Sequence, residues 1–257
     1  MEENSPNTLF SVRGVSKQFS GGIQALCGID LDMFEGECVV VAGANGSGKT
    51  LLMHILAGLV EPSAGEIFFR GKPIGECGRE LRHSVGLVFQ DSDAQILGET
   101  VEEDIRFGPE NLKLPQPEIE RRLEASLAAL ELAPKRDFTC RRLSGGEKRR
   151  LAVAGILAMG CNTVIFDEPF ANLDWPGVVQ VLTIIRNLKS DGKTVIVLTH
   201  ELEKVLAFAN RLVILAAGKI RDQGEAEAVL DRLAPQWGVR DPRGVYTSAK
   251  DCTWLAE

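Results

Sequence analysis

The chain contains Gly43-Ala44-Asn45-Gly46-Ser47-Gly48-Lys49-Thr50, directly after the apolar run Val39-Val40-Val41-Ala42 and before Leu51-Leu52-Met53-His54-Ile55-Leu56. This loop fits the pattern G-x-x-x-x-G-K-[ST] in the strand–loop–helix setting that the pattern requires. Its glycines let backbone N–H groups wrap a phosphate, and the helix N-terminus adds favourable dipole charge. We expect Lys49 to reach the outer phosphates of a nucleotide and the Thr50 hydroxyl to hold Mg²⁺. The alternative is an ordinary glycine-rich turn.

Short apolar runs alternate with helical patterns along much of the chain, which predicts an α/β fold with a largely parallel sheet. The runs Val164-Ile165-Phe166 and Val195-Ile196-Val197-Leu198 are apolar without alternation. Such runs are typical of strands that are covered on both faces. The predicted strands are Glu37–Ala42, Glu66–Arg70, Val85–Gln90, Thr163–Asp167, Thr194–Thr199 and Leu212–Leu215.

Residues 91–160 have a different, helical character. The period of the apolar residues predicts a helix over Glu118–Leu132, and a second helix is expected over Gly145–Met159. We interpret residues 91–160 as a helical subdomain within a single domain, residues 1–257, whose nucleotide-binding core is formed by residues 8–90 and 161–224. Residues 225–257 are expected to form a C-terminal helix and a tail. The tail has few helix or strand signals from Asp231 onward, but its aromatic residues, Trp237, Tyr246 and Trp254, indicate that it packs against something.

The composition is that of a globular protein that can bury a substantial core, with 257 residues of which 44% are hydrophobic and 25% charged. The net charge of −7 does not favour a nucleic-acid partner. The longest nearly uncharged apolar stretch, Leu151–Cys161, is shorter than the roughly 18 residues that a membrane span needs. Because the start Met1-Glu2-Glu3-Asn4 is acidic rather than basic, no signal peptide is predicted. We expect a cytosolic chain with peripheral membrane contact.

The six cysteines and three histidines show no metal-ligand spacing. We expect the thiols to be small buried or half-buried groups, as is usual in a reducing compartment. His54 and His83 are interpreted as ordinary core or surface residues, and no protein-bound metal cage is predicted.

Two carboxylates end the strand Thr163-Val164-Ile165-Phe166, namely Asp167 and Glu168. Charges at the C-terminal end of a central strand lie in the crevice where open α/β sheets bind their ligands. Asp167 suits contact with Mg²⁺, and Glu168 suits orienting or activating an attacking water. The alternative is a strand that ends at a polar turn before Pro169.

A second candidate anion site is the segment Leu143-Ser144-Gly145-Gly146-Glu147. Ser144 and Glu147 form an S-x-x-E capping box, which alone explains the start of a helix. Two glycines in the first turn destabilise a helix, however, so they indicate that a group such as a phosphate approaches the backbone closely. The following Lys148-Arg149-Arg150 is interpreted as a solvated helix face rather than a nucleic-acid patch.

With these residues in view, the chain resembles the ABC ATPases over nearly its whole length. Leu143–Glu147 resembles their signature motif, with Glu147 where many members carry Gln, and Gln90 lies where their Q-loop glutamine would be. Ala171-Asn172-Leu173-Asp174 resembles the D-loop, His200 resembles the switch histidine, and Phe19 falls where an aromatic ring usually stacks on adenine. Thr163 is a mild departure, because it replaces an apolar residue in the Walker B strand.

The resemblance implies the ABC ATPase fold: a P-loop NTPase core with a mixed, largely parallel sheet, an antiparallel β subdomain and an inserted helical subdomain. It implies ATP and Mg²⁺ as cofactors, catalytic roles for Glu168, His200 and Gln90, and Mg²⁺ contacts from Thr50, Gln90 and Asp167. The implied ATP-binding residues are Phe19, Gly43, Ala44, Asn45, Gly46, Ser47, Gly48, Lys49, Thr50, Leu51, Ser144, Gly145, Gly146 and Glu147.

The same resemblance implies a mechanism in which two cassettes, as a homodimer or a heterodimer, close head to tail around ATP. Each ATP would lie between the phosphate loop of one chain and Ser144-Gly145-Gly146 of the other. Closure drives a membrane partner and hydrolysis reopens the pair, which couples the chemistry to motion.

A narrower resemblance, to the ATPase component of energy-coupling-factor importers and especially the cobalt and nickel type, rests on residues 85–97 and 100–112. It implies that Asp91, Asp93 and Gln95 line a groove that takes a coupling helix of an integral membrane subunit. The chain would then lie at the cytoplasmic face of the cell membrane, with cobalt or nickel as the first expectation for the cargo and a vitamin as the second. The alternative is a polar helix cap after Gln90.

Three other functions stay open at this point: a soluble ABC ATPase acting on DNA or the ribosome, an exporter, and an importer of another class. DNA-repair members insert a long coiled coil before the signature, but only about 94 residues separate Thr50 from Ser144. Translation factors carry two cassettes in one chain, and this chain carries one. The residues after Gln90 argue, less decisively, against an exporter or an importer of another class.

Overall fold

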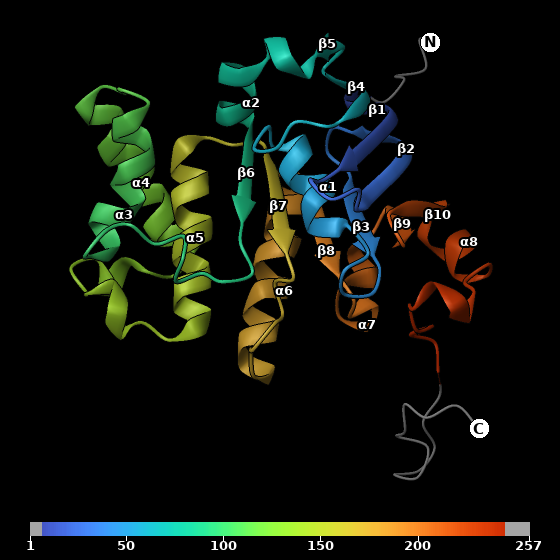
Figure 1. Cartoon of the computed structure of the whole chain (residues 1–257). Coiled ribbons are helices and arrows are strands. Elements are labelled where there is room, and N and C mark those ends of the chain that lie inside the picture. Colours follow the sequence, from blue (N-terminus) through green and yellow to red (C-terminus); the bar gives the residue numbers. More distant parts are fainter. Residues whose placement is uncertain (1–6, 245–257) are drawn as a thin grey trace, which may run out of the picture.

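The computed structural model describes residues 7–244, which form two sheets and surrounding helices (Figure 1). The larger sheet has the strand order β10-β9-β3-β8-β7-β6, and only the pairing of β9 with β10 is antiparallel. Its strands are β3 (Cys38–Ala42), β6 (Val85–Val88), β7 (Thr163–Asp167), β8 (Thr194–Thr199), β9 (Arg211–Ala216) and β10 (Lys219–Glu225). Every residue of β3, β7 and β8 is buried, as the unbroken apolar runs predict.

The second sheet is antiparallel, with the order β2-β1-β4-β5. Its strands are β1 (Thr8–Gln18), β2 (Gln24–Phe34), β4 (Ala64–Phe69) and β5 (Lys72–Pro73). Helix α1 (Lys49–Leu56) lies between this sheet and the larger one, and it buries Leu52, Met53 and Leu56 in a cluster with Phe10 of β1 and Val41 of β3. The antiparallel sheet therefore holds in place the helix that follows the glycine-rich loop.

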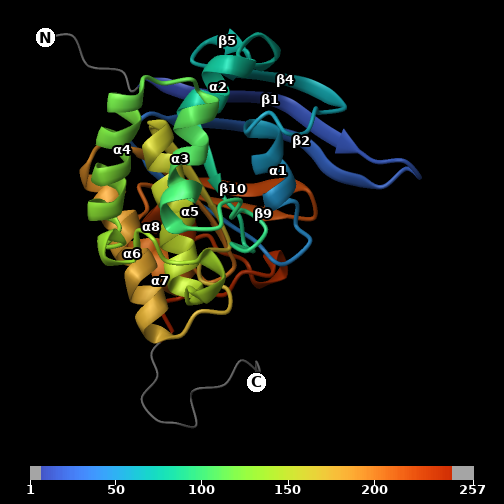
Figure 2. The same cartoon turned by 90° about the vertical axis from the view of Figure 1, so that its left-hand side faces the viewer.

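The segment between β6 and β7 contains three long helices, α3 (Val101–Asn111), α4 (Gln116–Ala129) and α5 (Gly145–Met159). They form one side of the molecule beside the edge strand β6 (Figures 1 and 2). Helix α5 approaches β6 very closely, because a Cβ atom at Gly86 would lie 2.2 Å from Cγ2 of Ile156. The observed α4 and α5 confirm both predicted helices, and α5 has the predicted bounds.

The remaining helices are α2 (Gly78–Ser84), α6 (Trp175–Ser190), α7 (Leu202–Val205) and α8 (Ala226–Leu230). Helix α6 packs against α5 and β8 and buries Val181, Ile185 and Leu188. After α8, the half-buried Trp237 packs against the main core cluster, as expected for the tail. Tyr246, Trp254 and Cys252 lie outside the described residues.

Strands β1, β2, β5 and β10 are absent from the sequence-based prediction, although each of them pairs with a neighbouring strand in the structure. The register of β1 shifts against β2 at several points, for example between Val12 and Val15. Each such irregularity breaks the period-2 pattern on which strand prediction relies. The predicted strand Glu66–Arg70 exists as β4, and it belongs to the antiparallel sheet.

The cysteines of the described residues are free thiols, and their burial agrees with the prediction. Cys38, Cys77, Cys140 and Cys161 are buried and Cys27 is half-buried. Within residues 7–244, no helix has both the length and the apolar character needed to cross a membrane.

Ion pairs fasten α3 to the neighbouring helical segment. Glu102 of α3 accepts hydrogen bonds from Arg106, at 2.7 Å between Nε and Oε1, and from Arg136. The Arg136 guanidinium, with help from Arg106, lowers the pKa of Glu102 to about 2 from its usual value of 4.5. Because the pKa is lower in the folded state, this pairing stabilises the fold above about pH 4.5, and the stabilisation is lost as the pH falls toward 2.

We expect Glu102→Gln to lower the free energy of unfolding by about 1 kcal/mol near pH 7, since two partly buried guanidinium groups lose one of their carboxylate partners and keep Glu120. Urea denaturation of the variant and the wild type at several pH values measures this. The difference should shrink as the pH falls below 4.5, and Glu110→Gln, an exposed position on the same helix, serves as the control. A difference that stays the same at low pH would contradict the assignment.

Candidate active site

The glycine-rich loop joins β3 to α1 and is packed so tightly that two of its glycines have no room for a side chain. A Cβ atom at Gly43 would lie 2.2 Å from the Leu215 carbonyl oxygen and 2.6 Å from Ser47 Oγ. Gly48 has a φ of 105° and ends the loop as the N-cap of α1, where a Cβ atom would lie 2.8 Å from Leu26. The sequence therefore needs glycine at both ends of the loop.

The open end of α1 has the features of a phosphate site. Gly48 supplies no side-chain cap, so the first N–H groups of the helix are not satisfied by a capping oxygen. The hydroxyl oxygen of Ser47 is buried and has no hydrogen-bond partner in the described structure. Unpaired donors at a helix N-terminus are suited to bind an anion.

Lys49 is only 5% exposed and is turned back onto the loop. Its Nζ donates to the carbonyl oxygens of Gly43 at 2.7 Å and Ala44 at 3.3 Å, and it lies 3.3 Å from Glu168 Oε1. The lysine charge is thus held next to the position where the outer phosphates are expected, and it is neutralised by Glu168.

Asp167 and Thr50 come together at the end of β7. The Thr50 hydroxyl donates to Asp167 Oδ1 at 3.1 Å. Burial raises the pKa of Asp167, the hydrogen bond from Thr50 opposes this rise, and the nearby Glu168 adds to it. A hydroxyl and a carboxylate side by side are ligands that Mg²⁺ prefers, so the donor set fits a divalent cation. Gln90, the third predicted Mg²⁺ ligand, lies two residues beyond the end of β6 and is exposed.

Glu168 has an unusual backbone conformation, and its carboxylate lies between the side chains of Lys49 and His200. Its φ is +44°, which is uncommon for a residue other than glycine. Its N–H donates to the Leu198 carbonyl at 2.9 Å, which ties the residue to the end of β8. Its carboxylate contacts Lys49 through Oε1 and His200 Nδ1, at 3.0 Å, through Oε2. The structure thus brings three predicted site residues from three strand ends into contact.

Ser144 caps helix α5 as the capping box predicts. Its Oγ accepts from the Glu147 N–H at 3.3 Å, and its own N–H donates to Glu147 Oε2 at 2.9 Å. Glu147 also pairs with Lys135, so both of its carboxylate oxygens are engaged within the chain. A Cβ atom at Gly146 would lie 3.0 Å from Gln180 Oε1 of α6, which gives this glycine a packing reason as well. Ser144 and Gly145 are exposed at the helix N-terminus.

The prediction of a solvated helix face for residues 148–150 is wrong. Lys148 pairs with Asp93, and Arg150 pairs with Glu131 and lies 3.9 Å from Glu147. Arg149 is 4% exposed and donates to the backbone carbonyls of Gln90 and Glu168. Three consecutive residues of a helix point in directions about 100° apart, so they cannot all share one face.

Phe19 and Leu51 are the outlying members of the predicted ATP-binding set. Phe19 lies in the turn between β1 and β2, where its ring is 47% exposed and 5.7 Å from Lys17 Nζ. Leu51 is half-buried in the first turn of α1. An exposed ring at the tip of a hairpin has a free face for stacking.

The family model for ABC transporters matches residues 26–171. The chain belongs to the ABC transporter family. Members of this family that bind ATP hydrolyse it to drive transport, and this chain is an ATPase. The matched range begins in β2 and ends in the segment that resembles the D-loop, so it includes the glycine-rich loop, both carboxylates and the segment that resembles the signature motif.

Relatives of this ABC ATPase match it over nearly its whole length. It is 44% identical to a putative ABC transporter ATP-binding protein of Halobacterium salinarum, over 91% of this chain and 100% of that one. It is 38% identical to the cobalt import ATP-binding protein CbiO of Rhodobacter capsulatus, over 91% and 85% of the two chains. It is 39% identical to the energy-coupling factor transporter ATP-binding protein EcfA of Carboxydothermus hydrogenoformans, over 92% and 88%.

A solved structure also resembles this ABC ATPase. CbiO1 from Clostridium perfringens, described as part of the ABC transporter complex CbiONQ, superimposes with a TM-score of 0.81 at 33% identity. The similarity covers 88% of this chain and 91% of that one. It confirms the α/β fold with a mixed sheet and an additional antiparallel sheet.

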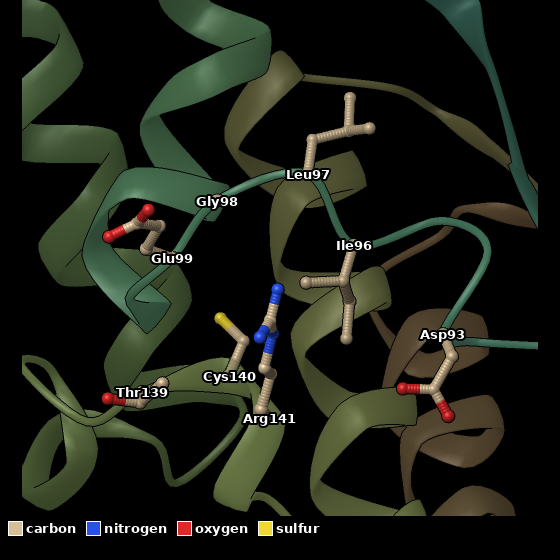
Figure 3. Close-up of a pocket in the computed structure, with 8 residues that line it drawn as sticks. All are labelled: Asp93, Ile96, Leu97, Gly98, Glu99, Thr139, Cys140 and Arg141. Carbon is tan, nitrogen blue, oxygen red and sulfur yellow. The ribbon is translucent and has the colours of Figure 1, made fainter.

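Two hollows border the segment after Gln90 of this ABC ATPase. One, of about 460 Å³, lies between Gln90–Asp93, the start of α5 and residues Ala171–Leu173, in the segment that resembles a D-loop. The other, of about 620 Å³, is lined by Asp93, Ile96, Leu97, Gly98, Glu99, Thr139, Cys140 and Arg141 (Figure 3). Figure 3 shows the Arg141 side chain reaching up from the loop before α5 toward Ile96, with Asp93 to one side. Asp93 borders both hollows.

The three residues of the predicted partner groove are placed differently. Asp91 and Asp93 are exposed, and Asp93 pairs with Lys148. Gln95 is turned toward the backbone: its Oε1 accepts from the Phe89 N–H at 3.1 Å, and its Nε2 donates to the Leu87 carbonyl at 3.0 Å. In this structure the Gln95 side chain therefore fixes the path of the chain as it leaves β6.

Proposed function

We propose that this ATPase energises an energy-coupling-factor type importer, and that its cargo is cobalt or nickel ions. The observation that carries the proposal is the hollow beside the Q-loop, bordered by Asp93, in a chain similar to CbiO and EcfA over most of its length. EcfA relatives carry a general name that specifies no ion. A vitamin is therefore the second candidate for the cargo.

For ATP binding, we assign the phosphates to the loop from Gly43 to Gly48 and to the N-terminus of α1. Lys49 would exchange its two carbonyl contacts and its contact with Glu168 for the outer phosphates. Thr50 and Asp167, with Gln90, would hold Mg²⁺, which when bound neutralises charge that develops on the phosphates. Phe19 offers its exposed ring to the adenine.

For hydrolysis, we assign the water-orienting role to Glu168. Its carboxylate points into the same region as Lys49 and the Thr50–Asp167 pair, and His200 holds its second oxygen. When Lys49 moves to the phosphates, one oxygen of Glu168 becomes available to accept a hydrogen bond from water. His200, exposed at the end of β8, then orients the carboxylate from the other side.

The site of one chain is completed by a second chain, in our proposal. Ser144 and Gly145 are exposed at the N-terminus of α5, where backbone N–H groups can contact a phosphate that is bound to another protomer. The chain carries both half-sites, so a homodimer would have two complete sites. A heterodimer with a related ATPase would use the same surfaces.

For docking, we assign the 620 Å³ hollow and the neighbouring Asp91 to a coupling helix of an integral membrane subunit. The hollow combines acid at Asp93 with apolar surface at Ile96 and at Leu97, which is 65% exposed. A cationic residue on the partner would compete with Lys148 for Asp93 or would use Asp91. This docking would place the chain peripherally at the cytoplasmic face of the cell membrane.

Glu168→Gln should retain ATP binding and slow hydrolysis by roughly a hundredfold or more, because the amide cannot polarise the attacking water. ATP affinity is measured by equilibrium binding and turnover by phosphate release at saturating Mg·ATP. Hydrolysis close to the wild-type rate would show that Glu168 does not have this role.

The double variant Asp91→Ala with Asp93→Ala should bind nucleotide normally but recover about tenfold less membrane subunit in a pull-down, since the partner loses its acidic contacts. Glu61→Ala with Glu66→Ala removes two exposed acids elsewhere and serves as the matched control. Lys148→Ala tests whether releasing the cation that pairs with Asp93 is itself enough to change assembly. Equal recovery of the membrane subunit by the double variant would exclude this docking surface.

Right-side-out membrane vesicles that contain the chain with its co-purifying membrane subunits should take up labelled cobalt or nickel only when ATP is enclosed inside them, because the ATPase then lies on the inner, cytoplasmic face. The same vesicles carrying Glu168→Gln are the control, because their uptake should fall with hydrolysis. Uptake of a labelled B vitamin without metal uptake would replace the ion with the second candidate. A chain that co-purified only with RNA or DNA would contradict a transport function.

A further inference from the structure

One buried side chain joins helix α5 to both loops that hold the proposed catalytic residues. Arg149 lies in the second turn of α5, five residues after Ser144, and is 4% exposed. Its Nη2 donates to the Gln90 carbonyl at 2.9 Å, and its Nη1 donates to the Glu168 carbonyl at 3.3 Å. Gln90 follows β6 and Glu168 follows β7, so one guanidinium spans the ends of two neighbouring strands.

The chemistry of this contact requires arginine. A guanidinium group is planar and presents its donors in a fixed fork, so it sets the distance and direction between two carbonyl groups, whereas an ammonium group does not. The third donor, Nε, is buried without a partner in the described structure. Burial also lowers the pKa of Arg149, with Asp91 opposing the change. Burying a partly unpaired cation costs free energy, so the stability of the helix does not explain an arginine at this position.

The hydrogen bond from Arg149 to the Glu168 carbonyl adds to other hydrogen bonds that already restrain the backbone of Glu168. The Glu168 N–H is bonded to Leu198, and its carbonyl also accepts from the Ala171 N–H at 3.2 Å. Arg149 therefore completes the restraint of a residue whose φ of +44° is uncommon. The direction of the Glu168 side chain toward Lys49 and His200 depends on this backbone being held.

The neighbouring residue connects the same turn of α5 to the proposed docking surface. Lys148 pairs with Asp93, which borders the hollow described above. Consecutive residues of one helix thus contact the docking surface and the two catalytic loops, while Ser144 lies at the start of that helix.

We propose that Arg149 is a positioning residue for ATP hydrolysis, which makes the placement of Gln90 and Glu168 depend on the placement of helix α5. The inference rests on the roles proposed for Gln90 and Glu168. When a phosphate binds at the N-terminus of α5, or a coupling helix binds at the docking surface, a shift of α5 would then change the positions of Gln90 and Glu168 through the Arg149 side chain.

The test compares Arg149 with a second arginine of the same helical layer. Arg122 of α4 also donates to two backbone carbonyls, those of Ala158 at 3.1 Å and Met159 at 2.9 Å, but at the opposite end of α5. Arg149→Lys, Arg149→Met, Arg122→Lys and Arg122→Met are purified as full-length chains. For each, kcat and KM for ATP, ATP affinity and the thermal midpoint are measured.

We expect Arg149→Met to lower kcat by about tenfold or more, with KM for ATP within about twofold of the wild type, since misplaced catalytic groups slow the reaction more than they weaken binding. Arg149→Lys should recover part of the loss, because it keeps the charge and one hydrogen bond. The Arg122 variants should lose a similar amount of thermal stability and retain kcat within about twofold.

Wild-type kcat in both Arg149 variants would overturn the inference. The inference would also be overturned if the Arg122 variants, at the same thermal midpoint, lost as much kcat as the Arg149 variants. If Arg149→Met does not fold, the kcat of Arg149→Lys tests the inference. It is calculated per ATP-binding site, so that unfolded protein does not lower it. Glu168→Gln separates this inference from the roles on which it rests. A slow Glu168→Gln beside normal Arg149 variants rejects the inference alone, whereas a fast Glu168→Gln rejects the proposed role of Glu168.

Discussion

The parallel pairing of β3, β7 and β8 is the constraint on which the site depends. In this register Ala42 lies beside Thr199 and Asp167 lies beside Leu198, so three strands end at the same level of the sheet. Each strand is followed by one group of the site: the glycine-rich loop, the carboxylate pair, and His200. Because all three strands are fully buried, the backbone hydrogen bonds that set this level are shielded from water. The contacts among Lys49, Glu168 and His200 follow directly from that alignment.

Much of the site could be predicted from the sequence, because its residues follow unbroken apolar strands and carry distinctive loop chemistry. The loop from Gly43 to Thr50 and the pair Asp167 and Glu168 are of this kind. The pairing partners could not be predicted, since the contact between Lys49 and Glu168 joins residues that only the sheet brings together. The burial of Arg149 could not be predicted either, because its hydrogen-bond partners are backbone carbonyls, which have no sequence signature.

The antiparallel sheet shows the limit of reading the fold from patterns. Its strands β1 and β2 are long, but irregular pairing interrupts the alternation that would reveal them. Gln95 illustrates a related limit on function. Its position in the motif indicates a surface groove, whereas in the structure its amide bonds the backbone at Leu87 and Phe89. A polar side chain that satisfies buried backbone groups cannot be told from a ligand-binding one by sequence alone.

The absence of a side chain at Gly86 has a mechanical consequence. Ile156 packs closely against the backbone of β6 there, so sliding of α5 along the sheet would meet a steric barrier at this point. Ser144 lies twelve residues from Ile156 along α5, or about 18 Å, so a swing of about 10° around this fulcrum carries Ser144 by about 3 Å. Arg149 stands roughly midway along this lever arm and moves by about half as much. The single glycine thus lets a small tilt of the layer become a displacement comparable to a hydrogen-bond length at the far end of the helix.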